Sequence, residues 1–383
     1  MKLIKILSVF LFAVGANGLR ADTGAAHQQA QARPVQLGTS GGNVNLFFSC
    51  FGSLYCSSGT LGSLVQDSDG FQYILSNNHV MSRDINDGQV GDDVSQPGLI
   101  DANCDIAGAV ATFTTVVPIN FAGKNAKNKV DAGIAEIVSG NVDQAGLILD
   151  VGQASSQILP ADSNLLGRSV KKSGRTTGLT TGSVAAIGVT IKVCYDPCAL
   201  FTCSKVGTFV EQIRVTPGTF SDGGDSGSLI VENTASCPRA VGLLFAGSDS
   251  DTFAATFQNV VCELKRVTGL DFSLVGCGDF NVVTCPTGGG GKGNGGKGNP
   301  HNAAGIAHAS INAALRAKGR AEEALLKVAG VLGAGVGIDP KDRTKAVVEV
   351  YVEKATPATR AALPNAVDGV PVQIVETGIV RAY

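Results

Sequence analysis

The stretch SDGGDSGSLIVE, residues 221–232, places Ser226 in a turn of glycines and aspartates directly before an apolar run. Glycines beside a serine permit a sharp turn that exposes its hydroxyl, as a nucleophile requires. The same composition is also typical of an ordinary flexible loop. The partners that the rest of the chain offers Ser226 therefore decide both the chemistry and the fold.

A serine hydroxyl attacks well only when a base removes its proton, and imidazole is the usual base near neutral pH. The chain has four histidines. His27 precedes the strand-rich region, and His301 and His308 follow a glycine-rich break, which leaves His79 in FQYILSNNHVM. A lone histidine after a strand is often structural. Its presence in the same domain as the Ser226 turn favours a catalytic role.

The imidazole also needs a group that holds its tautomer and stabilises its cation. Asp131, in NKVDAGIAEI, stands where a loop becomes an alternating strand, and Asp105 and Asp143 are weaker candidates. An aspartate that simply ends a turn is the alternative interpretation. The order His79, Asp131, Ser226 differs from the serine-first order of α/β-hydrolases and matches the chymotrypsin arrangement.

Residues 42–285 predict a mainly β domain. Short runs rich in Val, Ile, Phe and Thr alternate with turn signals, and several have period two. Helical periodicity first occurs at about residues 258–266. The 50 glycines, the absence of tryptophan and the 16% of charged residues agree with many short strands. The pattern indicates a β-barrel or sandwich architecture.

The segment PTGGGGKGNGGKGNP, residues 286–300, predicts a flexible linker. Residues 301–383 then predict a small α+β module in the order αββαβ. An Ala-rich helix ends at Gly330, two strands flank DPKDRTK, a short helix starts at Thr356-Pro357, and a last strand follows. On the strand AVVEVYVE, valines occupy one face, and Glu349 and Tyr351 occupy the other.

The amino terminus predicts export. Residues 1–18 combine a basic start with an apolar run shorter than the ~20 residues of a membrane span, as in a signal peptide. Residues 19–41 form an N-terminal segment before the β domain. Ten cysteines, none after residue 285, favour disulfides in a protein secreted to the periplasm or the medium. Their pairing stays open. Zinc binding by Cys194, Cys198 and Cys203 is the weaker alternative, so we expect no metal.

Five blocks resemble the chymotrypsin-like serine peptidases of the bacterial secreted type. LSNNHV, VDAGIAEI and GDSGSLIV resemble the three catalytic blocks. KKSGRTTGLTTGSV, residues 171–184, is similar to the strand pair that opens the second barrel of alpha-lytic protease and the streptogrisins, and AVGLLFAGSD, residues 240–249, to their substrate groove. The resemblance spans about residues 50–270 and implies two six-stranded antiparallel β-barrels followed by the small module.

The resemblance also implies residue roles. His79 is the general base and then acid, Asp131 orients it, and Ser226 is the nucleophile. The backbone N–H groups of Gly224 and Ser226 form the oxyanion hole. Asp225 is expected to be buried and paired with a cation.

For that cation the resemblance implies Lys172, with Arg175 as the alternative. The substrate groove is assigned to Phe220, Phe245, Ala246 and Gly247. Phe220 stands six residues before the nucleophile, where the family often sets specificity, and its bulk leaves the preferred residue open.

The expected function is a secreted serine endopeptidase that hydrolyses peptide bonds through an acyl-enzyme without a cofactor. Its partner is a protein or peptide substrate. The net charge of −2 gives no case for nucleic acid, and no membrane insertion is expected. Alternatives are a catalytically silent scaffold and a self-processing peptidase of narrow specificity. Residues 301–383 could contact the peptidase domain and act in cis as a folding aid or an inhibitor. The alternative is that they form a spacer.

Overall fold

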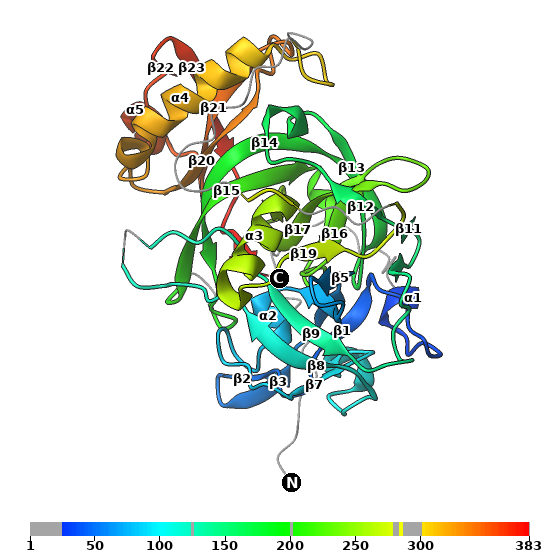
Figure 1. The fold of residues 1–383 in the computed structure, drawn as a ribbon. Coiled ribbons are helices and arrows are strands. Elements are labelled where there is room, and N and C mark those ends of the chain that lie inside the picture. The colour runs from blue at the N-terminus through cyan, green and yellow to red at the C-terminus, as the bar shows by residue number, and fades with distance from the viewer. Residues whose placement is uncertain (1–24, 124–125, 200–201, 279–282, 286–300, 383) are drawn as a thin grey trace.

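The computed structural model describes residues 25–123, 126–199, 202–278, 283–285 and 301–382 (Figure 1). The predicted signal peptide, residues 1–18, and the predicted linker, residues 286–300, lie outside these residues. Among the described helices, none combines the length and the apolar composition that a membrane crossing requires.

Seven strands between residues 39 and 137 and one later strand, β19, form an eight-stranded antiparallel sheet. Its order is β19-β5-β6-β9-β8-β7-β1-β4. The strands are β1 (Thr39–Asn43), β4 (Gly59–Leu61), β5 (Ser63–Asp67), β6 (Gln72–Ser76), β7 (Asp93–Ser95), β8 (Ala109–Val116), β9 (Gly133–Ile137) and β19 (Phe272–Leu274). Their apolar residues share one buried cluster with Val35 and Leu37, which precede β1. The pairing runs from β19 to β4, so this sheet has two ends.

The second sheet contains a closed six-stranded antiparallel barrel. Its strands are β13 (Ser169–Gly174), β14 (Gly178–Cys194), β15 (Val206–Thr216), β16 (Leu229–Glu232), β17 (Arg239–Gly247) and β18 (Thr252–Thr256). The order is β13-β16-β17-β18-β15-β14, and β13 also pairs with β14, which closes the ring. The predicted mainly β class is confirmed, with one closed six-stranded barrel in the second sheet. The first sheet has eight strands and two ends, where a second six-stranded barrel was predicted.

Short elements complete the two sheets. They are α1 (Ala25–Gln28), α2 (Asn78–Met81), β2 (Phe47–Cys50), β3 (Ser53–Cys56), β10 (Leu147–Ile148), β11 (Gly152–Gln153), β12 (Ser155–Ile158) and α3 (Phe257–Thr268). The predicted helix at 258–266 is thus α3. It ends at Gly269, which has φ +80° and whose N–H donates to Lys265 O, as at many helix ends.

The elements of the C-terminal module are α4 (His308–Leu325), β20 (Val331–Ile338), β21 (Ala346–Val352), α5 (Pro357–Ala362), β22 (Ala366–Val367), β23 (Val370–Glu376) and β24 (Arg381–Ala382). The module contains the predicted order αββαβ, and two short strands, β22 and β24, occur in addition. Thr356 caps α5, and Pro357 is its first residue, as predicted. The helix α4 ends before Gly330, because residues 326–330 turn into β20.

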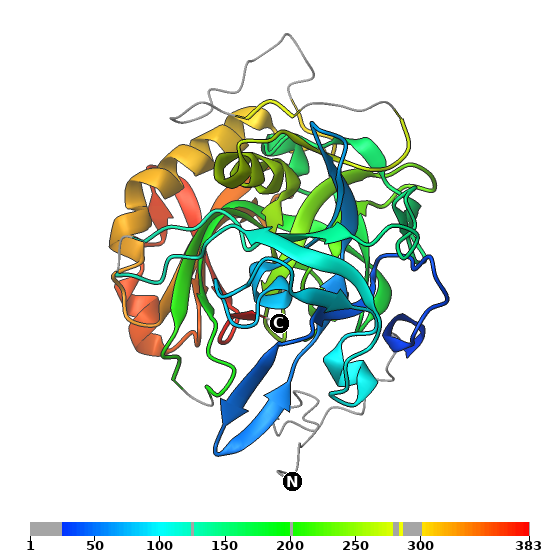
Figure 2. The same ribbon diagram turned by 60° about the horizontal axis from the view of Figure 1, so that its bottom comes forward.

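The strands of the module continue the sheet of the second barrel. β20 pairs antiparallel with β14, β21 pairs with β20, and β23 pairs with β21. Figures 1 and 2 show α4 lying along these strands, and Ile311 and Ala314 of α4 also pack with apolar residues of the barrel. Both faces of β21 are consequently buried: the valine face packs under α4, and Tyr351 packs with Phe253 and Phe245 of the barrel.

A buried ion cluster joins the module to the barrel. Arg214 of β15 donates to both carboxylate oxygens of Glu349 on β21, each at 2.9 Å, and also pairs with Asp251. The Tyr351 hydroxyl donates to Glu349 at 2.8 Å. Burial opposes the charge of Arg214, but the neighbouring carboxylates raise its pKa above the ordinary value. Separating the module would leave these charges unpaired and buried, which is costly.

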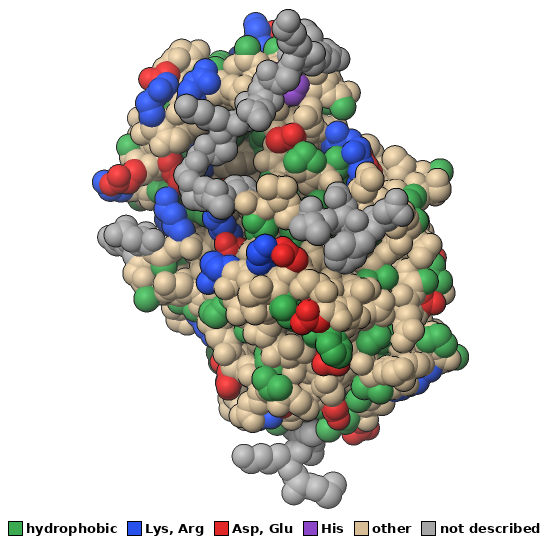
Figure 3. Space-filling view, in the orientation of Figure 1, with side chains coloured by type: hydrophobic (Ala, Val, Ile, Leu, Met, Phe, Trp, Pro, Cys, Tyr) green, Lys and Arg blue, Asp and Glu red, His purple; other side chains and the backbone are tan. Residues whose placement is uncertain are grey.

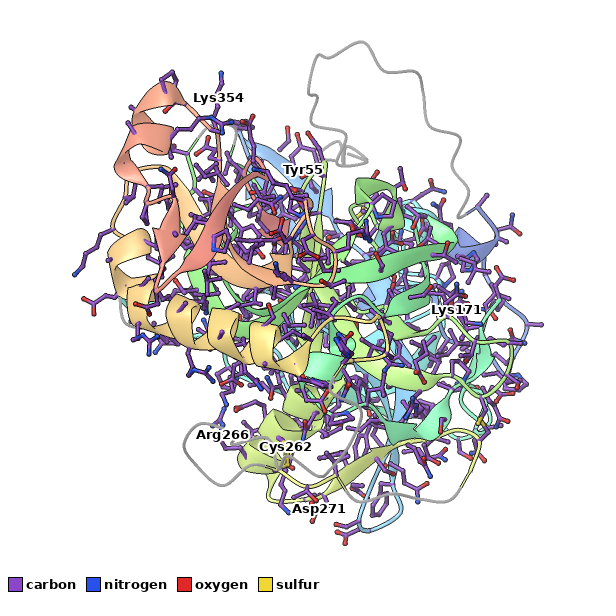
Figure 4. The ribbon with its side chains drawn as sticks, turned by 90° about the horizontal axis from the view of Figure 1, so that it is seen from above. Tyr55, Lys171, Cys262, Arg266, Asp271 and Lys354 are labelled. Carbon is purple, nitrogen blue, oxygen red and sulfur yellow. A yellow bond between two sulfur atoms is a disulfide. The ribbon has the colours of Figure 1, made fainter. Side chains whose placement is uncertain are left out.

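All ten cysteines form disulfides. The pairs are Cys50–Cys198, Cys56–Cys104, Cys194–Cys203, Cys237–Cys277 and Cys262–Cys285. Figure 4 labels Cys262 on α3. The predicted use of cysteine in disulfides is confirmed, and the three cysteines weighed as zinc ligands are among those bonded. Five disulfides suit an oxidising, extracellular environment.

Candidate active site

The predicted catalytic residues come from three elements that meet between the two sheets. His79 lies on α2, directly after β6, and Asp131 lies two residues before β9. Because β6 and β9 are paired, the ends of both strands bring these side chains together. Ser226 lies in the turn before β16 of the second barrel. Thr60 of β4 binds this turn, since its N–H donates to Ser226 O at 2.8 Å.

Asp131 holds the imidazole of His79 by one nitrogen. Nδ1 of His79 lies 2.6 Å from Oδ2 of Asp131. The other carboxylate oxygen accepts from the N–H of Asn78 at 2.7 Å, and Asp131 is fully buried. This contact fixes the orientation of the His79 ring.

The weaker candidates lie elsewhere. Asp105 is exposed, and Asp143 accepts from the N–H of Ala145 within its own turn. His27 is buried and contacts the hydroxyl of Ser173 at 2.9 Å. Within the described residues, none of these three side chains forms a hydrogen bond or ion pair with His79 or Ser226.

Tyr195 is a site residue that sequence reasoning missed. Its hydroxyl donates to Oδ2 of Asp131 at 2.7 Å, and its ring lies edge-on to the His79 ring, 6.0 Å between centroids. Burial and the Asp131 carboxylate raise the pKa of Tyr195 well above its ordinary value, so the hydroxyl remains a donor. No local pattern around Tyr195 signals this role, which depends on β14 carrying it across to the first sheet.

Tyr195→Phe is expected to lower kcat by about 10-fold, because a hydrogen bond to a charged group contributes about 1.5–3 kcal/mol. Asp131 would lose a donor, so its charge would stabilise protonated His79 more strongly. The midpoint of the pH dependence of kcat/KM should therefore move upward. The matched control is Tyr55→Phe. Tyr55 lies on the β2–β3 hairpin and is labelled in Figure 4. If the pH midpoint is unchanged, Tyr195 stabilises the fold but does not act on the His79–Asp131 pair.

The Ser226 hydroxyl lies against β17, the second strand after its turn. It donates to Phe245 O on β17 at 3.3 Å, and Ser226 is fully buried. Between the described atoms of Ser226 and His79 there is no hydrogen bond. Catalytic contacts of this kind often tighten only when substrate binds.

The backbone of the Ser226 turn is set up for an anion. Gly224 has φ +96°, and a Cβ there would lie 2.5 Å from Thr176 Oγ1 and 2.7 Å from Arg175 Nη1. Within the described part of the chain, the N–H groups of Gly224 and Ser226 have no hydrogen-bond partner. These are the two donors that the family resemblance assigns to the oxyanion hole.

Asp225 is buried beneath the turn and paired with Lys172. The Lys172 Nζ lies 3.2 Å from Asp225 Oδ2, and both side chains are fully buried. Asp225 also accepts from the N–H groups of Thr176 at 2.9 Å and of Asp222 at 3.0 Å. Burial lowers the pKa of Lys172, while the attraction of Asp225 opposes that shift.

Arg175, the alternative cation, has another partner. Its guanidinium donates twice to Asp101, each time at 2.6 Å. The N–H of Arg175 donates to the Thr60 hydroxyl at 3.0 Å, and that hydroxyl donates to Gly224 O at 2.9 Å. Arg175 thus ties the nucleophile turn to the first sheet, and Lys172 supports it from inside the second barrel.

The four residues assigned to the groove separate into two sets. Phe220 and Phe245 are fully buried; Phe220 packs in the interior of the second barrel and Phe245 against Phe209, 4.7 Å between centroids. Ala246 and Gly247 form the end of β17 and pair with β24. The bulky side chain of Phe220 therefore fills the barrel.

Comparisons with known proteins give one match to a family model and matches to solved structures. Residues 121–277 match a family model described as the Nal1 C-terminal domain. No curated protein matches the chain. Proteases are among the similar solved structures. A glutamic acid-specific serine protease is 21% identical, covering 63% of this chain and 100% of that one, with a TM-score of 0.39.

Two further structures have similar scores. The Nocardiopsis protease NAPase is 19% identical over 61% of this chain and 97% of its own, with a TM-score of 0.36. Thermobifida fusca protease A is 20% identical over 62% and 98%, with a TM-score of 0.36.

Proposed function

We propose that the protein is a secreted serine endopeptidase that hydrolyses peptide bonds through an acyl-enzyme. The observation that carries the proposal is the contact of 2.6 Å between His79 Nδ1 and Asp131 Oδ2. Val80, the neighbour of His79 on α2, and Ser226 O both lie next to Gly59, so this contact forms near the turn that holds Ser226. A buried carboxylate on one imidazole nitrogen prepares the other to accept a proton. A structural histidine would not need to lie next to such a turn.

The reaction would follow from these positions. His79 Nε2 takes the proton from Ser226 Oγ as Oγ bonds to the substrate carbonyl carbon. The same proton passes to the leaving amine as the C–N bond breaks. Water then attacks the acyl carbon while His79 Nε2 takes its proton, and the bond from that carbon to Ser226 Oγ breaks as His79 returns the proton to Oγ, which releases the acid product. Asp131 stabilises the imidazolium at each step, and Tyr195 holds Asp131 in place.

The N–H groups of Gly224 and Ser226 would bind the oxygen anion of the tetrahedral intermediate. Gly224→Ala is expected to lower kcat by about 10²- to 10³-fold, because its positive φ and its contacts with Thr176 and Arg175 leave no space for Cβ. Gly223→Ala is the matched control, since a Cβ there meets nothing within 4 Å. Equal losses in both variants would contradict the assignment.

The expected setting is extracellular. Residues 1–18 would be removed on export, and the five disulfides would form outside the cytoplasm. On the face in Figure 3, positive and negative side chains are interspersed. We propose a protein or peptide as the substrate.

The test is digestion of an unfolded protein by the purified chain, with product sequences determined by mass spectrometry. New termini at defined sites, sensitive to a serine-directed inhibitor, are the expected result. Cleavage confined to residues 286–300 of the chain itself would favour a self-processing enzyme instead. An absence of cleavage by the folded protein, with and without its C-terminal residues, would favour a silent scaffold.

A further inference from the structure

The end of the described chain is a strand of the second barrel. β24 pairs antiparallel with β17, with Ala382 opposite Ala246 and Arg381 opposite Gly247. On its other side it pairs with the end of β14, and Cys194 N donates to Val380 O at 2.9 Å. In Figures 1 and 2, the red end of the ribbon runs from the module to the centre of the molecule. The tail thus fills the space between β17 and β14.

The tail is anchored by its side chains as well. Val380 is 1% exposed and belongs to the buried cluster that contains Phe209, Phe245 and Tyr351. Ala382 packs against the same cluster. Backbone pairing on two sides and a buried valine hold residues 380–382 in place.

We propose that residues 380–382 occupy the groove in which a peptide substrate binds, so that the chain inhibits itself in cis. The inference rests on the proposed function, because the groove matters only if Ser226 is a nucleophile. Extended peptides bind proteins by adding a strand to an open sheet edge. The end of β17 is such an edge, next to the nucleophile turn, and β24 already pairs with it.

The register of the tail also defines how a substrate would lie. Arg381 faces Gly247 and Ala382 faces Ala246, so the next residue of a peptide bound in this way lies beside Phe245. The carbonyl of Phe245 accepts the hydrogen bond from Ser226. That next residue therefore presents its carbonyl to the nucleophile. The groove selects extended peptides with a small residue just before the cleaved one and a branched aliphatic residue at the position of Val380.

The module keeps the tail at high local concentration. β20 extends the barrel sheet along β14, and Arg214 and Glu349 form a buried ion pair across the same junction. A segment presented by a docked module binds at an effective concentration in the millimolar range, even when the free peptide binds weakly. Relief of inhibition requires only that a few C-terminal residues leave the groove.

The first experiment measures the rate of labelling by a fluorophosphonate for the full chain and for a chain that ends at residue 379. If the tail occupies the groove in about nine molecules of ten, removing it raises the fraction of molecules that can react about 10-fold. We expect the labelling rate to rise by at least that factor. Val380→Asp should have the same effect, because a buried carboxylate would expel the tail. Val90→Asp, at a valine that is 82% exposed, is the matched control. The unfolding midpoints of all forms are measured alongside.

The second experiment separates this inference from the proposed function. The peptide GIVRAY, which copies residues 378–383, is tested for binding to the shortened chain carrying Ser226→Ala, next to a peptide of the same composition in another order. We expect GIVRAY alone to bind, and only weakly to the full chain. Binding without any fluorophosphonate labelling would support the groove and refute the peptidase. Equal labelling rates with and without the tail, and no peptide binding, would overturn the inference and leave the peptidase standing.

Discussion

Ser226→Ala lowers kcat/KM for peptide hydrolysis by at least about 10⁴-fold in the proposed mechanism, because no other hydroxyl replaces the attacking oxygen. The backbone donors of Gly224 and residue 226 remain, so a small residual rate over water persists. The rates are measured on a fluorogenic peptide with the chain that ends at residue 379. Ser236→Ala, at an exposed serine before β17, is the control.

His79→Ala is expected to cost a similar factor, and the double variant with Ser226→Ala little more. Residues that act as one unit lose their common effect once either is removed, so the two losses are not additive. A Ser226→Ala variant that keeps its rate within about 10-fold would contradict the mechanism, since such a loss is far below that of a nucleophile. Additive losses would separate His79 from the same step.

Lys172→Met lowers the free energy of unfolding by about 3–5 kcal/mol, because it leaves the buried Asp225 carboxylate without its cation. The methionine is close in volume to the stem of the lysine, so the loss reports the charge. Urea unfolding measures it. Lys327→Met, at an exposed pair with Glu323, should change stability by less than about 1 kcal/mol.

The same substitution should lower activity as well as stability. Asp225 accepts the N–H groups of Thr176 and Asp222, so its displacement would move the backbone of the turn that carries Gly224 and Ser226. Unchanged stability and activity in Lys172→Met would refute the supporting role of this pair. Loss of stability alone would restrict the pair to folding.

Much of the fold could be predicted from the sequence because its signals are local. Alternation of apolar residues locates strands such as β6 and β21, and Gly269 and Thr356 mark helix ends. The spacing and order of His79, Asp131 and Ser226 were also accessible, since each stands next to a strand with a recognisable pattern.

The remaining features depend on contacts between distant segments. The contact of Tyr195 with Asp131 joins positions 64 residues apart with no pattern in either segment. Phe220 occupies the barrel interior because the turn before Ser226 folds inward, which composition does not encode. Strand pairing between the barrel and the module is equally hard to predict, because no pattern in the sequence of β14 marks the edge that pairs with β20.

The disulfide pairing illustrates the same limit. Cysteine number and position predicted that disulfides form, yet Cys50 pairs with Cys198 across 148 residues. For Glu349, the alternation of the strand predicted which face of β21 carries this side chain. The sequence could not predict that Glu349 is buried, because its partner Arg214 lies on β15 of the barrel.

Fluorophosphonate labelling followed by peptide mapping tests the central claim most directly. We expect a single adduct on Ser226, formed faster by the chain that ends at residue 379, and no adduct in Ser226→Ala or His79→Ala. If the folded protein stays unlabelled in both its full and its shortened form, or is labelled on another residue, Ser226 is not an activated nucleophile and the peptidase assignment is wrong.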